Sequence, residues 1–444
     1  MKAINTIKNI FRIEDLRNRI LYTLGILLIY RLGKYVTLPG IDPSQLENLQ
    51  AQTKQGIMGL LDMFSGGAFS QASVFALGIM PYISASIVIQ LMGIAVPYFQ
   101  RLQKEGESGR RKINQITRYL TVGILILQAP TYILNLHAQL PESAFVLKGS
   151  FFTVSSVIIL TAGTMFVMWL GEKITDKGIG NGISLIIMIG IIARLPSSMV
   201  FEFGTRINGS GGLVSLLIEF VFLFMVVLCT ILLVQGTRRI PVQYAKRIVG
   251  NKQYGGVRQY IPLKVNAAGV MPIIFAQAIM MLPIMLIGYS SSDSVSGFAA
   301  AFSNMYGFWY SFVFGILIVL FTYFYTAITI NPTQMAEDMK KNGGFIPGIK
   351  PGRKTVEFLD TIMSRITLPG SFFLALVAIL PAFAVNLGVS GQFAQFYGGT
   401  SLLILVGVVL DTLQQIESHL LMRHYDGLMK SGRIKGRTGS AAII

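Results

Sequence analysis

Few residues in this chain have types and spacing that could support chemistry. The three histidines, His137, His419 and His424, form no metal-ligand pattern with one another. The motif Gly178–Gly182 (GIGNG) is superficially similar to a phosphate-binding glycine loop, but no strand precedes it and no Walker-type Lys or Ser/Thr follows. The single cysteine, Cys229, lies in an apolar run and is interpreted as a small buried hydrophobe. We therefore predict no catalytic residues, no metal, no cofactor and no enzyme activity.

The composition indicates which elements would have to position any functional residues. Hydrophobic residues make up 52% of the 444 residues and charged residues only 13%, whereas soluble domains carry about 25% charged residues. The 37 Lys and Arg residues far exceed the 20 Asp and Glu residues. A nucleic-acid-binding protein could be this basic, but it would not be this apolar. The composition predicts an integral membrane protein whose basic residues lie in loops.

Membrane-spanning helices are expected wherever about 20 mostly apolar residues follow one another. The clearest stretches are Ala72–Phe99, Tyr119–Leu136, Ser150–Gly171, Leu213–Gln235, Val265–Ser292 and Gly307–Ile330. The uncharged stretch Ile366–Leu410 is long enough for two spans with a turn at Asn386–Gln392, and Ile20–Thr37 and Gly178–Ala193 are weaker candidates. We expect an all-α polytopic membrane protein with ten spans.

The distribution of Lys and Arg predicts the orientation of these spans. An N-terminus in the cytoplasm puts 31 of the 37 basic residues into the inner segments. Those segments are 1–19, 100–118, 172–177, 236–264, 331–365 and 417–444. Both termini are therefore expected in the cytoplasm. Residues 1–19 have apolar residues at helical spacing and no cleavage site after them, so they predict an amphipathic helix on the membrane surface and not a signal peptide.

Ten spans divide into two groups of five, here 20–202 and 203–421, followed by a basic tail, 422–444. Because five is an odd number, the second group would enter the membrane from the opposite side. That geometry permits two inverted halves with a pathway between them, although no sequence similarity between the halves is visible.

Irregular backbone at membrane depth is expected only where protein or a water-filled cavity covers it. Gly56–Phe69 is apolar but too short to span, and it ends near a Gly-Gly pair. It is either a helix on the outer surface or a short helix folded back into the mouth of a pore. Prolines at 81, 130, 272 and 283 lie inside predicted spans and would kink them.

Two predicted cytoplasmic segments, 236–264 and 331–365, are longer than a connection requires. The first carries seven basic residues and no acidic residue. Both also contain aromatic or apolar residues, such as Tyr254 and Phe345. This pattern favours docking of a cytoplasmic partner, including one that presents RNA phosphates.

Eight stretches of the chain match one known family in the same order. They are Met63–Ser73, Ala76–Ile87, Glu105–Ile113, Gly178–Ser184, Tyr244–Arg247, Ile261–Pro272, Gly344–Gly352 and Gly398–Ile404. On these stretches the chain resembles the SecY/Sec61-alpha family of protein-conducting channels over nearly its whole length. The resemblance implies two pseudo-symmetric inverted halves of five spans and a short plug half-helix at about Gly56–Phe69.

The resemblance also implies site residues. The plug would include Leu60, Leu61, Met63, Phe64, Gly66 and Gly67, and a pore ring would comprise Ile79, Ile83, Ile191, Ile274 and Ile404. A narrow apolar ring would exclude water and ions in the resting channel. A lateral gate that a signal sequence opens would involve Ser84, Gln128, Asn266 and Leu282.

Docking of a motor or ribosome would fall on the basic loops. The residues implied are Arg238, Arg239, Lys246, Arg247, Lys252, Arg258, Lys350 and Arg353. The partners implied are the SecE and SecG subunits, the SecA motor ATPase that supplies ATP hydrolysis, the translating ribosome, signal peptides and nascent chains, membrane lipids, YidC and SecDF. The implied location is the bacterial cytoplasmic (inner) membrane.

Two other functions compete with this interpretation. A secondary transporter would place ionisable residues deep in its spans, and only Glu219 and Asp411 are candidates here. An assembly scaffold would need neither kinked spans nor a plug-like segment.

Overall fold

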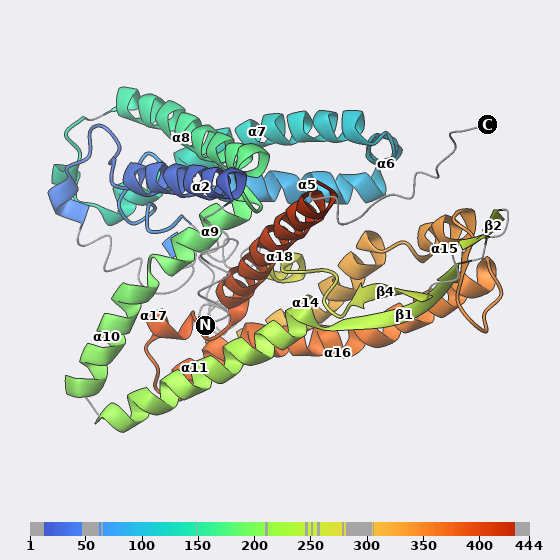
Figure 1. The fold of residues 1–444 in the computed structure, drawn as a ribbon. Coiled ribbons are helices and arrows are strands. Elements are labelled where there is room, and N and C mark those ends of the chain that lie inside the picture. The colour runs from blue at the N-terminus through green and yellow to red at the C-terminus, as the bar shows by residue number, and fades with distance from the viewer. Residues whose placement is uncertain are drawn as a thin grey trace. The chain divides into compact units, whose positions relative to one another are not determined.

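A computed structural model describes residues 13–46, 62–63, 65–147, 149–208, 212–244, 247–249, 252–254, 258–277, 279–280, 304 and 306–430. Helices dominate this part of the chain (Figure 1). It divides into two compact units, one formed by residues 1–53, 59–193 and 408–444 and the other by 54–58 and 194–407. Each unit is described separately below.

The first unit contains the helices of the N-terminal part of the chain. They are α2 (Glu14–Gly33), α5 (Met80–Ala95), α6 (Pro97–Lys104), α7 (Glu107–Gln139), α8 (Ser150–Lys177), α9 (Gly182–Ile192) and the second part of α18 (Gly399–Lys430). Two short 3-10 turns, η1 (Pro43–Gln45) and η2 (Glu142–Ala144), lie in its loops. Within it α7 packs on both α5 and α8, and α8 packs on α2 and α9.

The second unit holds α10 (Leu195–Asn208), α11 (Gly212–Gln235), α14 (Phe308–Thr329), α15 (Pro332–Lys341), α16 (Arg353–Asn386), α17 (Gly391–Ala394) and the start of α18. It also holds the strands β1 (Thr237–Tyr244), β2 (Arg247–Val249), β3 (Lys252–Tyr254), β4 (Arg258–Lys264) and β5 (Gly344–Phe345). Among its helices, α14 packs most extensively against α16.

Among the described residues, seven helices or helix pairs are long and apolar enough to cross a membrane, and the bent pair α5–α6 would be an eighth. The all-α polytopic prediction is confirmed by this pattern. The seventh predicted span, Val265–Ser292, is described only as far as residue 280, and the first, Ile20–Thr37, overlaps α2, which is less apolar than the others. The count of ten remains a prediction.

The side chains of α11 show why these helices need lipid. Leu217, Phe224 and Leu232 each leave more than 60% of their surface exposed, and so do several of their neighbours. A soluble helix would bury such a face, because large contiguous apolar patches are rare on soluble monomers. In a bilayer the hydrocarbon chains cover it, so no protein partner is required.

The structure corrects two predictions about the second span. It was expected to begin at Ala72, but α5 begins at Met80. Residues 72–74 instead pair with the chain after α2, through Leu38 N–H to the Ala72 carbonyl (2.9 Å) and Val74 N–H to the Val36 carbonyl (2.9 Å). Pro81 therefore lies in the first turn of a helix, where no hydrogen bond is lost, and does not kink it.

The other prolines differ in their effect. Pro130 lies inside α7 as predicted, and α16 contains two further prolines, Pro369 and Pro381. Pro272 falls at the start of a helical segment, and Pro283 lies outside the described residues. Within this part of the chain the interior prolines are therefore concentrated in the two longest helices, α7 and α16.

The two long polar loops fold together into one substructure. Strand β1 pairs antiparallel with β4 along its length and with β5 at Gln243 and Tyr244, and β5 belongs to the other loop. Alternate residues of β1, Ile240 and Val242, are buried, as expected for a strand with one covered face. The buried core shared by these elements contains Ile240, Val242, Leu263, Ala336, Met339, Ile346, Leu359 and Met363. We call this substructure, made of β1, β4, β5, α15 and the first turns of α16, the hairpin platform.

Candidate functional site

Residues 62–63 and 65–70 form a tight, self-bonded turn ahead of α5. The carboxylate of Asp62 accepts from the Ser70 N–H (2.7 Å), and its backbone carbonyl accepts from the Gly67 N–H (2.7 Å). Gly66 and Gly67 have φ of +67° and +87°, which residues with a Cβ rarely adopt. The Gly-Gly pair is therefore required by the backbone here. We call this segment the 62–70 turn.

Three side chains from two helices hold the carbonyls of this turn. The Tyr30 hydroxyl donates to the Ser65 carbonyl (3.2 Å), and Arg31 Nη1 donates to the Gly66 carbonyl (3.1 Å); both residues are on α2. From α7 the Tyr132 hydroxyl donates to the Phe69 carbonyl (2.8 Å). Because buried carbonyls need partners, these donors fix the turn in one position.

A fourth contact comes from α9, where the backbones of Gly66 and Gly190 touch. A Cβ built on Gly66 would lie 3.0 Å from the Gly190 Cα, and one built on Gly190 would lie 3.1 Å from the Gly66 Cα. A side chain at either position would force the facing backbone to move by a few tenths of an ångström. Ile191, predicted to line a pore, is the next residue along α9 and is fully buried.

The sequence did not single out Tyr30, Arg31, Tyr132 or Gly190. Contacts between residues so far apart along the chain leave no periodic signal. One clue was present: Arg31 is among the few basic residues that the predicted orientation leaves outside the inner segments. A charge near the end of an apolar helix is costly in lipid and so indicates a partner.

The predicted plug and pore residues fall in both units. Met63, Gly66 and Gly67 belong to the 62–70 turn, whereas Leu60, Leu61 and Phe64 lie outside the described residues. In the first unit Ile79 is buried just before α5, and Ile83 is half-buried in its first turn. In the second unit Ile274 is half-buried and Ile404, on α18, is buried.

The predicted gate residues have different surroundings. Ser84 is half-buried on α5, and Gln128 is exposed on α7, which packs against α5. Asn266 is half-buried, and its side-chain oxygen is buried without a hydrogen-bond partner among the described residues. Leu282 lies outside them.

The predicted docking residues map to the hairpin platform and the adjoining strands. Arg238 and Arg239 are exposed on β1, and Lys350 and Arg353 are exposed just before α16 and at its start. The Arg353 side chain is 93% exposed and lies 3.5 Å from the Glu357 carboxylate. Arg247, Lys252 and Arg258 belong to strands β2, β3 and β4, and Lys246 lies outside the described residues. The sheet was not predicted, although apolar and polar residues alternate in 237–244 and 258–264, a pattern that indicates strands.

Four amides of the loop Gly178–Gly182 are already hydrogen-bonded within the protein, so they do not cradle a phosphate in the way that a glycine loop does. Its N–H groups donate to side chains from three helices: Ile179 to Thr23 Oγ1 (3.1 Å), Gly180 to Gln415 Oε1 (2.9 Å) and Gly182 to Thr175 Oγ1 (2.9 Å). Asn181 caps α9. The motif joins α2, α8, α9 and the second part of α18, which is a structural role.

A match to one protein family covers most of the chain: the SecY family model matches residues 73–413. A protein translocase subunit SecY from Streptomyces scabiei is 44% identical over 438 residues, covering 95% of this chain and 98% of the relative. The chain belongs to the SecY family. A second SecY relative, from Mycobacterium bovis, is 42% identical and covers 94% of this chain and 98% of its own length.

Solved structures agree with the SecY assignment at the level of the fold. The structure of a protein-conducting channel superposes with a TM-score of 0.62 at 18% identity, covering 90% of this chain and 91% of that one. Canine Sec61 in a ribosome-channel complex gives a TM-score of 0.56 at 17% identity and 90% coverage of this chain. The described helices therefore have the SecY channel fold, and the family match begins just after the 62–70 turn and covers the hairpin platform and α18 as far as Leu413.

Proposed function

We propose that this chain is the channel subunit of a bacterial Sec translocase. Unfolded secretory proteins would cross the cytoplasmic membrane through it, and membrane proteins would leave it sideways into lipid. The membership of the SecY family carries this function. The chain is a pore and not an enzyme, so a partner motor has to supply the ATP hydrolysis.

The 62–70 turn supports a plug at this place. Four contacts from three helices fix a glycine-rich segment whose position outside the regular helices is unusual for a membrane protein. One of the similar solved structures is described by the statement that the plug domain of SecY stabilises the closed state and maintains a membrane seal. We extend that role to residues 56–69 here, with Leu60, Leu61, Met63, Phe64, Gly66 and Gly67 in the seal.

The pore ring and the lateral gate complete the proposal. The ring residues are Ile79, Ile83, Ile191, Ile274 and Ile404, and the gate residues are Ser84, Gln128, Asn266 and Leu282. Stiff, branched apolar side chains would close a narrow pore to ions without offering hydrogen bonds to a passing chain. In this proposal the ring residues come from both inverted halves, 20–202 and 203–421, as a pathway between halves requires.

The hairpin platform supports docking of cytoplasmic partners. Its exposed arginines and lysine could meet acidic protein surfaces or RNA phosphates. Among the solved relatives, Sec61 and Ssh1 are described in complexes with ribosomes. We propose the SecA motor and the ribosome as partners, together with SecE, SecG, YidC and SecDF, and both chain termini in the cytoplasm.

An ion-leak experiment tests the ring. The double substitution Ile83→Gly and Ile191→Gly should make the resting channel, reconstituted with its partner subunits, conduct ions. The matched control, Ile126→Gly with Ile158→Gly, makes the same change at exposed positions of α7 and α8 and should leave the channel sealed. Equal conductance in the two double variants would refute the ring.

A further inference from the structure

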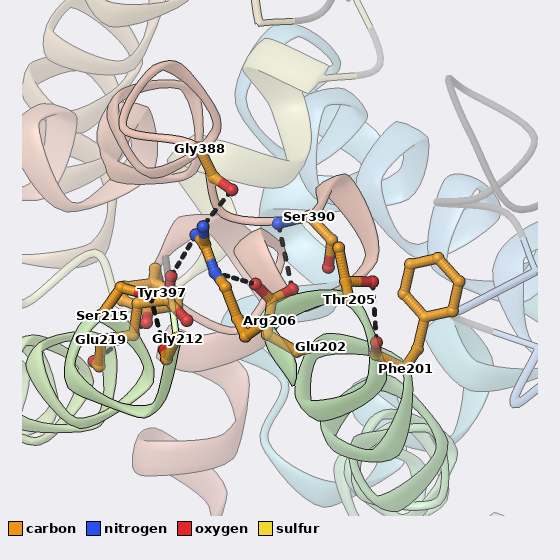
Figure 2. Close-up of polar contacts among 10 residues, drawn as sticks. All are labelled: Phe201, Glu202, Thr205, Arg206, Gly212, Ser215, Glu219, Gly388, Ser390 and Tyr397. Atoms are coloured by element: carbon orange, nitrogen blue, oxygen red, sulfur yellow. Dashed lines mark hydrogen bonds and ion pairs between the residues drawn. The ribbon is translucent and has the colours of Figure 1, made fainter. Parts of the chain in front are cut away.

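A buried charge cluster in the second unit contains none of the residues proposed above. Arg206 on α10 contacts the Glu202 carboxylate one turn earlier (3.2 Å) and pairs with Glu219 on α11. The three side chains are only 12%, 3% and 9% exposed. Figure 2 shows the Arg206 guanidinium between the two carboxylates.

The same three residues bind the chain that leads from α16 to α18. Arg206 Nη2 also donates to the Gly388 carbonyl (2.7 Å), and Glu202 Oε2 accepts from the Ser390 N–H (3.1 Å) (Figure 2). The Tyr397 hydroxyl donates to the Glu219 backbone carbonyl (2.9 Å). The cluster thus fixes the turn that follows α16, the start of α17 and the residue two positions before α18.

Stability alone is a weak reason to keep such a cluster. Removing charges from water costs about as much as a buried ion pair returns, and apolar replacements of similar volume are often as stable. What charges add is geometry, since a guanidinium with three oxygen partners allows one arrangement only. Here the cluster fixes the geometry of residues 388–397, the segment that leads into α18.

Helix α18 carries Ile404, five residues after its first residue, Gly399. A helix is stiff over so short a distance, so a shift or rotation at its start moves Ile404 equally. The start is confined on its other side too, because Gly398 packs against the Val377 carbonyl and Pro381 of α16 with no room for a Cβ.

We propose that Glu202, Arg206 and Glu219 are positioning residues that set the place of Ile404 in the pore ring. This inference rests on the proposed pore role of Ile404. It also gives Glu219, the acidic residue deep in a predicted span, a task other than carrying an ion for a transporter.

Site-specific crosslinking tests the proposal. In a Cys229→Ser background, Ile404→Cys is combined with a translocation-arrested precursor that carries one cysteine, and the disulfide yield is measured in membranes containing the full translocase. Arg206→Gln should lower that yield at least about threefold, because disulfides form only over a narrow range of Cβ separations. The yield from Ile83→Cys, on α5, should not change.

A second variant separates geometry from folding. Arg206→Gln alone leaves two buried carboxylates without a cation, whereas Arg206→Gln with Glu219→Gln keeps the net charge of the cluster unchanged. The double variant should recover the thermal stability of the channel in detergent but not the crosslink from position 404. Arg111→Gln, which removes an exposed ion pair with Glu107, is the control and should alter neither.

Each result has a defined meaning. A normal yield from position 404 in both cluster variants would overturn the positioning role while leaving the pore ring intact. Equal losses from positions 404 and 83 would overturn it as well, since the defect would then be general. No crosslink from position 404 in the otherwise unchanged channel would refute the pore role of Ile404 itself, and the inference with it.

Discussion

Gly66 and Gly190 meet backbone to backbone, with the Cα of each within 3.1 Å of where the other's Cβ would stand. One belongs to the proposed plug and the other to α9, one residue before a proposed pore-ring isoleucine. The proposed plug is therefore in direct contact with a helix that carries a proposed pore-ring residue.

Gly190→Ala should loosen the plug without harming α9. Alanine is the better helix former, so the helix itself should gain stability. Its methyl group would press on the Gly66 backbone, and such overpacking costs about 1–3 kcal/mol in the closed state. We expect a larger ion leak through the resting channel. Gly123→Ala on α7, where nothing lies within 4 Å of the added Cβ, is the control and should not leak.

Tyr132→Phe should have a similar effect by a different route. Phenylalanine keeps the ring contact with Phe69, whose centroid lies 4.8 Å away, but leaves the Phe69 carbonyl without its donor. A buried unpaired carbonyl costs about 1–3 kcal/mol. Since about 1.4 kcal/mol corresponds to tenfold in an equilibrium, the displaced plug should become roughly tenfold more populated.

Protease accessibility or crosslinking of the plug can measure that population. The control is Tyr119→Phe on the same helix, because Tyr119 is 77% exposed. If both tyrosine variants gave the same accessibility as the unchanged channel, the hydrogen bond to Phe69 would have no part in holding the plug.

Cysteines at positions 84 and 282 should crosslink in the resting channel and stop export. Ser84 is half-buried on α5, where a cysteine is of nearly the same size. The proposed gate opens between these positions, so a covalent bond across them would keep it shut. Reduction of the disulfide should restore export. Export that continues through a verified crosslink would show that the gate lies elsewhere.

Arg247→Glu combined with Lys350→Glu should weaken binding of SecA or of ribosomes, by about tenfold at low salt and less at high salt. The spans should stay folded, because Lys350 is exposed on the hairpin platform. Lys177→Glu, at an exposed position on another predicted cytoplasmic segment, is the control. Normal binding of both partners to the double variant would remove the platform from the docking site.

Helices that face lipid were predicted closely from the sequence. Apolarity alone placed a span at Leu213–Gln235, and α11 runs from Gly212 to Gln235. Lipid accepts any apolar face, so composition was enough there. The same reasoning failed at residues 72–79, where an uncharged stretch adopts irregular backbone with Ala72 at φ +44° and Gly78 at φ +55°. Hydrophobicity reports burial, and it does not distinguish a helix from a loop that other protein segments cover.

The candidate site was predictable only in part. The family resemblance suggested the plug glycines and the ring isoleucines, which remain predictions, but it did not suggest Tyr30, Arg31 or Tyr132, whose contacts join distant segments. The buried partner of Glu219 was equally hidden, because nothing in the sequence relates it to an arginine 13 residues away on another helix. The pairing of β1 with β5 was not predicted either, because the segments 236–264 and 331–365 were interpreted as two independent loops.

That pairing has a mechanical consequence. Leu359 and Met363, in the first turns of α16, belong to the core that also buries Ile240 and Val242 of β1. A partner that binds either loop therefore binds a substructure that is packed onto α16. A force applied to that substructure would act on α16, a helix long and apolar enough to cross the membrane, and would not be lost in a flexible linker.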